Sequence, residues 1–252
     1  MSERRLDAFP APQANSPGAA SRGFTLVEVA ISILVITLLI GTLLVPLSTQ
    51  VEQRKTNETQ KVLDEIRDAL LGFALANGYL PCPDMTTGGA GANDGQEDVD
   101  VSTGLCVTNE GNLPWVTLGV GAFDTWGNRF RYRVDGQFAQ RSPLFNLGTI
   151  NTTLGVCTTQ ACSSRLTAGS DGPPAVVLSH GRNGLGAMNS LSNSQNPNPG
   201  GADELENTDG DTQFVSRTAS AAGSTVGEFD DIVTWLSREV LLNRMVAAGR
   251  LP

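Results

Sequence analysis

The sequence is poor in the side chains that acid–base chemistry and nucleic-acid binding use. It has one histidine, two lysines and a charged fraction of 17% among its 252 residues, and this charged fraction is low for a soluble protein. The formal net charge is −9, whereas binding to nucleic-acid phosphates needs clustered lysine and arginine. We therefore expect no nucleic-acid partner, and His180 is the one histidine available to a catalytic triad.

A second absence is local, because no charged residue lies between Val29 and Val51. The run from Phe24 to Leu47 holds 17 apolar residues among 24, and Glu28 is its only charge. Twenty-four helical residues extend about 36 Å, enough to cross a bilayer core of about 30 Å. The sequence therefore predicts a membrane-spanning helix over 24–47, with the lipid bilayer as a partner.

The helical pattern continues beyond this run to Asn77. Gly78 supplies a helix stop, and Pro46 cannot donate a hydrogen bond within the helix. We expect one helix over 24–77 that kinks or melts locally near residues 41–46. Apolar residues recur at helical spacing in its second half: Val62, Ile66, Ala69, Leu70 and Phe73. This stripe predicts packing against a sheet in the same chain, and a coiled-coil seam with a partner is the alternative.

Residues 1–23 are polar, rich in proline and alanine, and unable to form a core. The segment that follows, Arg22-Gly-Phe-Thr-Leu-Val-Glu28, resembles the processing site of type IV pilins and type II secretion pseudopilins. The resemblance implies that a prepilin peptidase removes 1–23 by cleaving between Gly23 and Phe24. It also implies N-methylation of the new Phe24 amine.

Glu28 is expected to act in assembly. A carboxylate packed away from water among copies of an apolar helix needs a cation, and the Phe24 amine of a neighbouring subunit is a candidate. We therefore expect Phe24 and Glu28 to be the assembly residues. The alternative is that Glu28 lies at an interface with water and has no partner.

Residues 78–252 predict a globular head. Many turns and short apolar runs favour an α+β, pilin-like fold, in which the long kinked helix packs on a small antiparallel sheet with long loops. Phe130, Tyr132 and Val134 are expected to face the core, with three arginines on the other face. Further strands are expected over 174–179 and 213–215, a strand or helix over 232–236, and a short C-terminal helix over 238–248.

All four cysteines lie in this head, and an even count in an exported domain predicts disulfides. Three pairings are open, and the sequence favours the local one, Cys82 with Cys106 and Cys157 with Cys162. A zinc site that includes the closely spaced Cys157 and Cys162 is the alternative.

Two head segments are similar to the calcium-site segments of pseudopilins: Ser179–Gly184, and Asp230-Asp231-Ile232. The resemblance implies calcium as a candidate cofactor, with Asn183, Asp230 and Asp231 as ligands, although Asn183 stands where the family commonly has aspartate. The acidic loops 93–98 and 207–211 are weaker candidates. The alternative is that all these runs are solvated turns.

The resemblance implies a structural subunit, a minor pilin or pseudopilin of a type II secretion pseudopilus or a type IV pilus. Its implied partners are a prepilin peptidase, other pilins or pseudopilins, and an inner-membrane assembly platform. Its implied location is the bacterial inner membrane, as a single pass with a cytoplasmic N-terminus and a periplasmic head, and then a periplasmic or surface filament. We expect no catalytic residue, and expect His180 to be a turn residue bonded to backbone. The alternatives are an adhesin that binds through loops 84–112 and 185–228, or an anchored enzyme that uses His180.

Overall fold

The computed structural model describes residues 23–87, 91–150, 153–167 and 171–251, without the side chains of 41–47. The chain divides into two units, residues 1–50 and 51–252. The expected leader, residues 1–23, lies outside the described residues except for Gly23. The second half of the long helix therefore belongs to the same unit as the head.

Helix α1 extends from Leu26 to Asn77 and is helical throughout, so the local melting expected near residues 41–46 is wrong. Thr25 accepts a hydrogen bond on its side chain from the backbone N–H of Glu28, at 3.2 Å, and so caps the first turn. At the other end Gly78 has a φ of 88°, a conformation that glycine adopts without strain. The stop expected at Asn77-Gly78 is confirmed.

The expected membrane span is not supported. Within the part of the chain that the structure describes, no helix is long and apolar enough to cross a membrane. The described side chains of the apolar run end at Ile40, and a span needs about 20 consecutive apolar residues. The prediction of a single-pass inner-membrane protein with a transmembrane segment over 24–47 is corrected accordingly.

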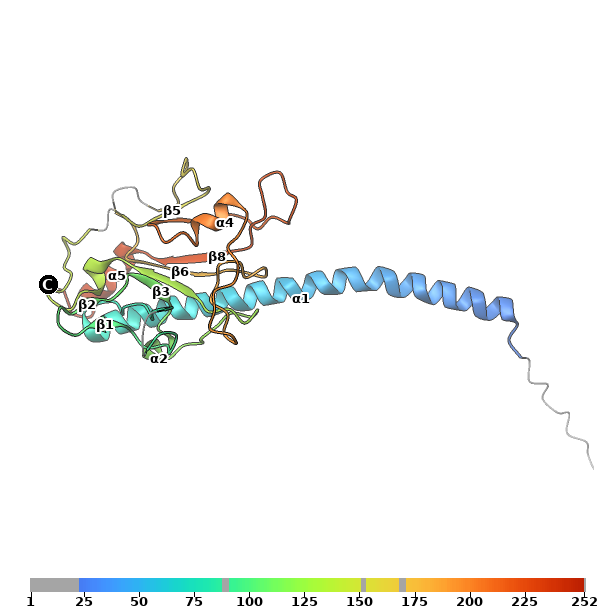
Figure 1. Ribbon diagram of the computed structural model, residues 1–252, viewed down its shortest axis with the longest axis horizontal. Coiled ribbons are helices and arrows are strands. Elements are labelled where there is room, and N and C mark those ends of the chain that lie inside the picture. The colour runs from blue at the N-terminus through green and yellow to red at the C-terminus, as the bar shows by residue number, and fades with distance from the viewer. Residues whose placement is uncertain (1–22, 88–90, 151–152, 168–170, 252) are drawn as a thin grey trace, which may run out of the picture. The chain divides into compact units, whose positions relative to one another are not determined.

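The main sheet of the second unit has four antiparallel strands (Figure 1). Their order is β3 (Glu110–Asn112), β4 (Arg131–Val134), β6 (Ala175–Ser179) and β8 (Ile232–Leu236). Arg131 lies opposite Leu178, and Val177 lies opposite Thr234. The strands expected over 129–134 and 174–179 are therefore confirmed, and 232–236 is a strand.

One face of this sheet packs against the second half of α1. Phe130 and Tyr132 are fully buried there, as their alternation in the sequence predicts. The helix contributes a stripe of four buried side chains, Leu63, Ile66, Leu70 and Ala74. Intramolecular packing is confirmed, but the stripe is rotated from the predicted one, and Ala69 and Phe73 are only partly buried. Helix α5 (Arg238–Ala247), expected from its spacing, completes this core with Leu241, Leu242 and Met245.

The opposite face of the sheet is covered by a second layer (Figure 1). Strands β5 (Gly155–Cys157) and β7 (Gln213–Val215) form a separate parallel pair. A second apolar cluster joins this pair to the sheet through Leu154, Val156, Val176, Leu178 and Phe214. Helix α4 (Ala202–Glu206) packs beside β7.

The predicted fold class is corrected by this arrangement. In place of a pilin-like α+β fold with one antiparallel sheet and a membrane-spanning helix half, the described residues form a mixed α/β structure with several sheets. The parallel pair arises because β5 and β7, whose paired residues are 58 apart in the sequence, meet over the second core, which local periodicity does not encode. The remaining elements are short: β1 (Val99–Asp100), β2 (Leu105–Cys106), α2 (Trp115–Leu118) and α3 (Gly136–Ala139).

Candidate functional site

The expected processing and assembly residues stand at the start of α1. Gly23 and Phe24 precede the helix, Phe24 is 79% exposed, and Glu28 lies in the first helical turn. A carboxylate there interacts favourably with the helix dipole. The spacing of Thr25 and Glu28 is that of a capping box, so the motif also has a purely structural use.

The helix that follows is apolar on all sides. Every large apolar side chain from Leu26 to Ile40 is at least 45% exposed, including Val29, Ile33 and Leu38. Amphipathic helices of globular proteins expose a polar face instead. An exposed apolar surface of this kind marks a site of association.

The expected calcium ligands meet in the head, and the structure adds a carboxylate that the sequence prediction missed. Oxygens of Glu204, Asp230 and Asp231 lie within 4.8 Å of one another. Asn183 lies beside them, but its side-chain amide donates to Glu204 at 3.1 Å and its oxygen accepts from Leu185 N–H. The structure therefore places Glu204, rather than Asn183, among the clustered oxygen donors. No spacing signal identifies Glu204, since it comes from α4, 26 residues before Asp230.

These carboxylates are mutually repulsive. Burial raises the pKa of Asp230 to about 7, with further increases from Glu204 and Asp231 and an opposing hydrogen bond from Asn183 N–H. Burial, and next the charge of Asp231, raises the pKa of Glu204. Asp230 Oδ1 is buried without a hydrogen-bond partner among the described residues. An all-oxygen donor set of this kind fits calcium, and calcium binding here stays a prediction.

The two weaker acidic candidates differ from each other. Carboxylates of Glu206, Asp209 and Asp211 also gather within 4.8 Å, with both aspartates exposed. In the loop 93–98 the aspartates instead accept hydrogen bonds from backbone N–H groups. Asp98 accepts from Met85 N–H at 2.7 Å, and Asp94 accepts from Gln96 N–H at 2.8 Å. This second loop is thus a set of hydrogen-bonded turns.

His180 is fully buried directly after β6, and the prediction that it bonds to backbone is wrong. Neither ring nitrogen has a hydrogen-bond partner among the described residues, and Nδ1 lies 3.6 Å from Asp231 Oδ1. The hydroxyl of Ser179 donates to Asp124 at 2.6 Å rather than to the imidazole. A serine–histidine pair is therefore not assembled here.

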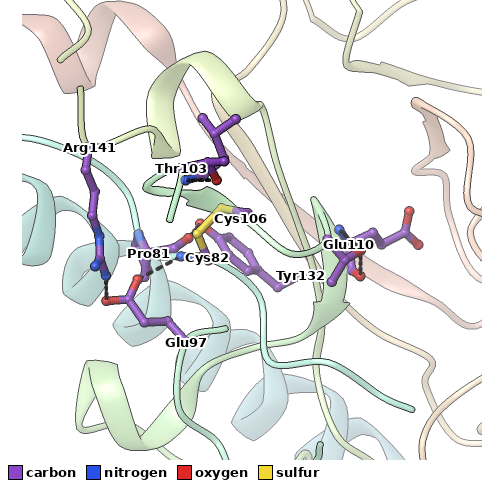
Figure 2. The surroundings of a disulfide bond; sticks show 10 residues. Pro81, Cys82, Glu97, Thr103, Cys106, Glu110, Tyr132 and Arg141 are labelled. Atoms are coloured by element: carbon purple, nitrogen blue, oxygen red, sulfur yellow. Dashed lines mark hydrogen bonds and ion pairs between the residues drawn. A yellow bond between two sulfur atoms is a disulfide. The ribbon is translucent and has the colours of Figure 1, made fainter. Parts of the chain in front are cut away.

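Both cysteine pairs are disulfides, Cys82–Cys106 and Cys157–Cys162, as local pairing predicted. Figure 2 shows the first of them beside Glu97, which accepts from Cys82 N–H at 3.1 Å and from Arg141 at 2.8 Å. The buried Tyr132 hydroxyl donates to Pro81 O at 3.0 Å. These contacts join the segment after α1 to β4.

In comparisons with known proteins, no family model, no curated protein and no solved structure matches the chain.

Proposed function

We propose that this protein is a structural subunit, a minor pilin or pseudopilin, of a type II secretion pseudopilus or a type IV pilus. One observation carries the proposal: the first part of α1 is apolar and exposed on all sides, with its single charge, Glu28, in the first turn. Copies of such a helix cover one another in a filament and remove this surface from water. Other pilins or pseudopilins, an assembly platform and a prepilin peptidase are the corresponding partners.

Processing is tested at Gly23. A methyl group added there meets no atom within 4 Å, so Gly23→Ala leaves the fold undisturbed. We expect co-expression with a prepilin peptidase to remove 23 residues from the normal chain, leaving 229, and to leave Gly23→Ala uncut. Mass spectrometry of both chains measures this, and full-length normal chain recovered from filaments would contradict the proposal.

Assembly is tested at Glu28 with substitutions that separate charge from capping. Glu28→Gln keeps a residue suited to the third position of a capping box but loses the charge. Thr25→Ala weakens the cap and keeps the charge. We expect Glu28→Gln to be processed yet to lower filament yield at least about tenfold, as loss of a buried ion pair would, and Thr25→Ala to assemble normally. Equal yields from the two variants would exclude the pairing of Glu28 with a neighbouring amine.

A binding role for the head is a second candidate, favoured by a specific observation. The loops 84–112 and 185–228 both contribute residues to one cavity, among them Thr108 and Gln195. Loops that converge on a cavity over a rigid sheet are a common design of binding sites. Cells whose filaments carry Arg129→Gln, a change inside this cavity, test the role. Lost adhesion at normal filament yield supports it, and unchanged adhesion contradicts it.

A further inference from the structure

The cavity between the two loops has a volume of about 300 Å³ and lies over the edge of the main sheet. Three arginines at alternate positions line it: Arg131 and Arg133 from β4, and Arg129 from the extended segment just before that strand. Residues at this spacing share a face of a strand. The head has ten arginines against 18 acidic residues, yet three of the ten line this one cavity.

Among the described residues that line the cavity, Glu110 of β3 is the only acidic one. Its carboxylate accepts from Nη1 of both Arg131 and Arg133. Register explains the geometry, since Glu110 lies directly opposite Arg133. One carboxylate cannot balance three guanidinium groups, so Glu110 and the three arginines together carry a formal charge of +2.

The two paired arginines retain unused donors. Among the described residues, Arg131 uses only Nη1, and Arg133 adds a bond of 3.0 Å from Nη1 to Gly210 O. The two side chains are mostly buried, at 18% and 17% exposed. Among the described residues, Nε of Arg133, like Nε of Arg129, is buried without a hydrogen-bond partner. A buried donor is costly unless an acceptor pairs with it.

Arg129 forms the third wall and is fixed in place. Its guanidinium lies 4.1 Å from the centre of the Trp115 ring, and its Nη2 donates to the side chain of Asn193 at 2.9 Å. No carboxylate among the described residues forms an ion pair with it, and burial lowers its pKa despite the charge of Asp84. Its charge is therefore held at the cavity with no carboxylate of the described residues bonded to it.

We infer that this cavity is a binding site for a compact oxyanion, a phosphate or carboxylate group, held by Arg129, Arg131 and Arg133. Guanidinium groups match the paired oxygens of both anions. The volume is at the lower end of small-molecule sites, so it admits a small anion rather than a folded partner. The inference rests on the second candidate function, binding through the head loops, and names its ligand chemistry. It is independent of filament assembly.

The experiment uses the full-length chain in detergent solution, with inorganic phosphate and succinate as separate probes at constant ionic strength. We expect one probe or both to shift the arginine Nε–H signals of Arg131 and Arg133 in NMR spectra and to raise the thermal midpoint. A response to phosphate alone assigns a phosphate ligand, and a response to succinate alone assigns a carboxylate. Signals that stay unchanged with both probes would overturn the inference.

Matched variants separate the site from general charge. Arg129→Gln removes a cavity arginine, and we expect about tenfold or greater weakening of the responding probe. Arg129→Lys keeps the charge without the planar fork, so we expect intermediate affinity. Arg244→Gln removes an exposed arginine of α5, and equal weakening by this control would overturn the inference. Probe binding with unchanged adhesion would leave the inference standing and remove only the adhesion role.

Discussion

At the scale of single residues, the head concentrates buried charge at Asp230. Its carboxylate lies with those of Glu204 and Asp231, and one of its oxygens has no partner among the described residues. The sequence singled out Asp230 and Asp231 through the resemblance of their segment to the calcium-site segments of pseudopilins. It could not single out Glu204, because only the packing of α4 beside β7 brings that carboxylate into the group.

Asp230 makes stability depend on pH. Its pKa rises from 3.8 to about 7 on folding, first through burial, so between these values the native state holds a proton that the unfolded chain has lost. This contribution to the free energy of unfolding is full below about pH 4 and is lost as pH rises through 7. We expect Asp230→Asn to be more stable than the normal chain above pH 7, with the difference vanishing near pH 4, in urea titrations.

The control for this change is Asp68→Asn, which removes one exposed carboxylate from α1. An equal pH-dependent gain in that variant would assign the effect to net charge rather than to the buried group.

Adding calcium at neutral pH is a second test of the same carboxylate. We expect it to stabilise the normal chain and not Asp230→Asn, because a bound cation offsets the clustered carboxylates. No stabilisation of either chain would contradict calcium binding.

At the scale of elements, α1 combines two surfaces in one helix. From Leu26 to Ile40 its apolar side chains are exposed, whereas from Leu63 onward one stripe is buried against the main sheet. The helix itself, its end at Asn77 and the burial of a stripe followed from sequence periodicity. The sequence did not predict that Leu63 and Ala74 belong to the buried stripe, because their burial depends on the side chains that they meet on the sheet.

The buried stripe should carry much of the stability of the head. Leu70 is 1% exposed, so Leu70→Ala leaves a cavity at the contact of helix and sheet. We expect it to lower the free energy of unfolding by about 2–5 kcal/mol, measured by chemical denaturation. Leu191→Ala makes the same change at a side chain that is 96% exposed, and we expect a loss within about 0.5 kcal/mol. Similar losses in both variants would show that this stripe does not support the core.

At the scale of the whole molecule, two disulfides tie the chain of the head. The Cys82–Cys106 bond joins residues 24 positions apart in the sequence, and the Cys157–Cys162 bond joins residues five positions apart. A longer closed loop removes more conformational entropy from the unfolded chain. The first bond also joins the segment that follows α1 to the hairpin of β1 and β2.

Removing the two bonds should therefore have unequal effects. We expect the double substitution of Cys82 and Cys106 by alanine to lower the free energy of unfolding by about 3 kcal/mol. The matched substitution of Cys157 and Cys162 should lower it by about 2 kcal/mol. Denaturant titration of both variants measures the difference, and a larger loss from the short loop would contradict this account.

The sequence by itself determined what depends on neighbours along the chain. Periodicity predicted α1, α5 and the alternation of β4, and the nearness of cysteines favoured their local pairing. The tertiary structure alone decided what depends on contact between distant segments: the parallel pair of β5 and β7, the approach of Glu204 to Asp230, and the cavity that gathers three arginines under two loops. The reason is physical, because local spacing fixes which side chains share a face, whereas burial against a distant segment fixes what that face meets.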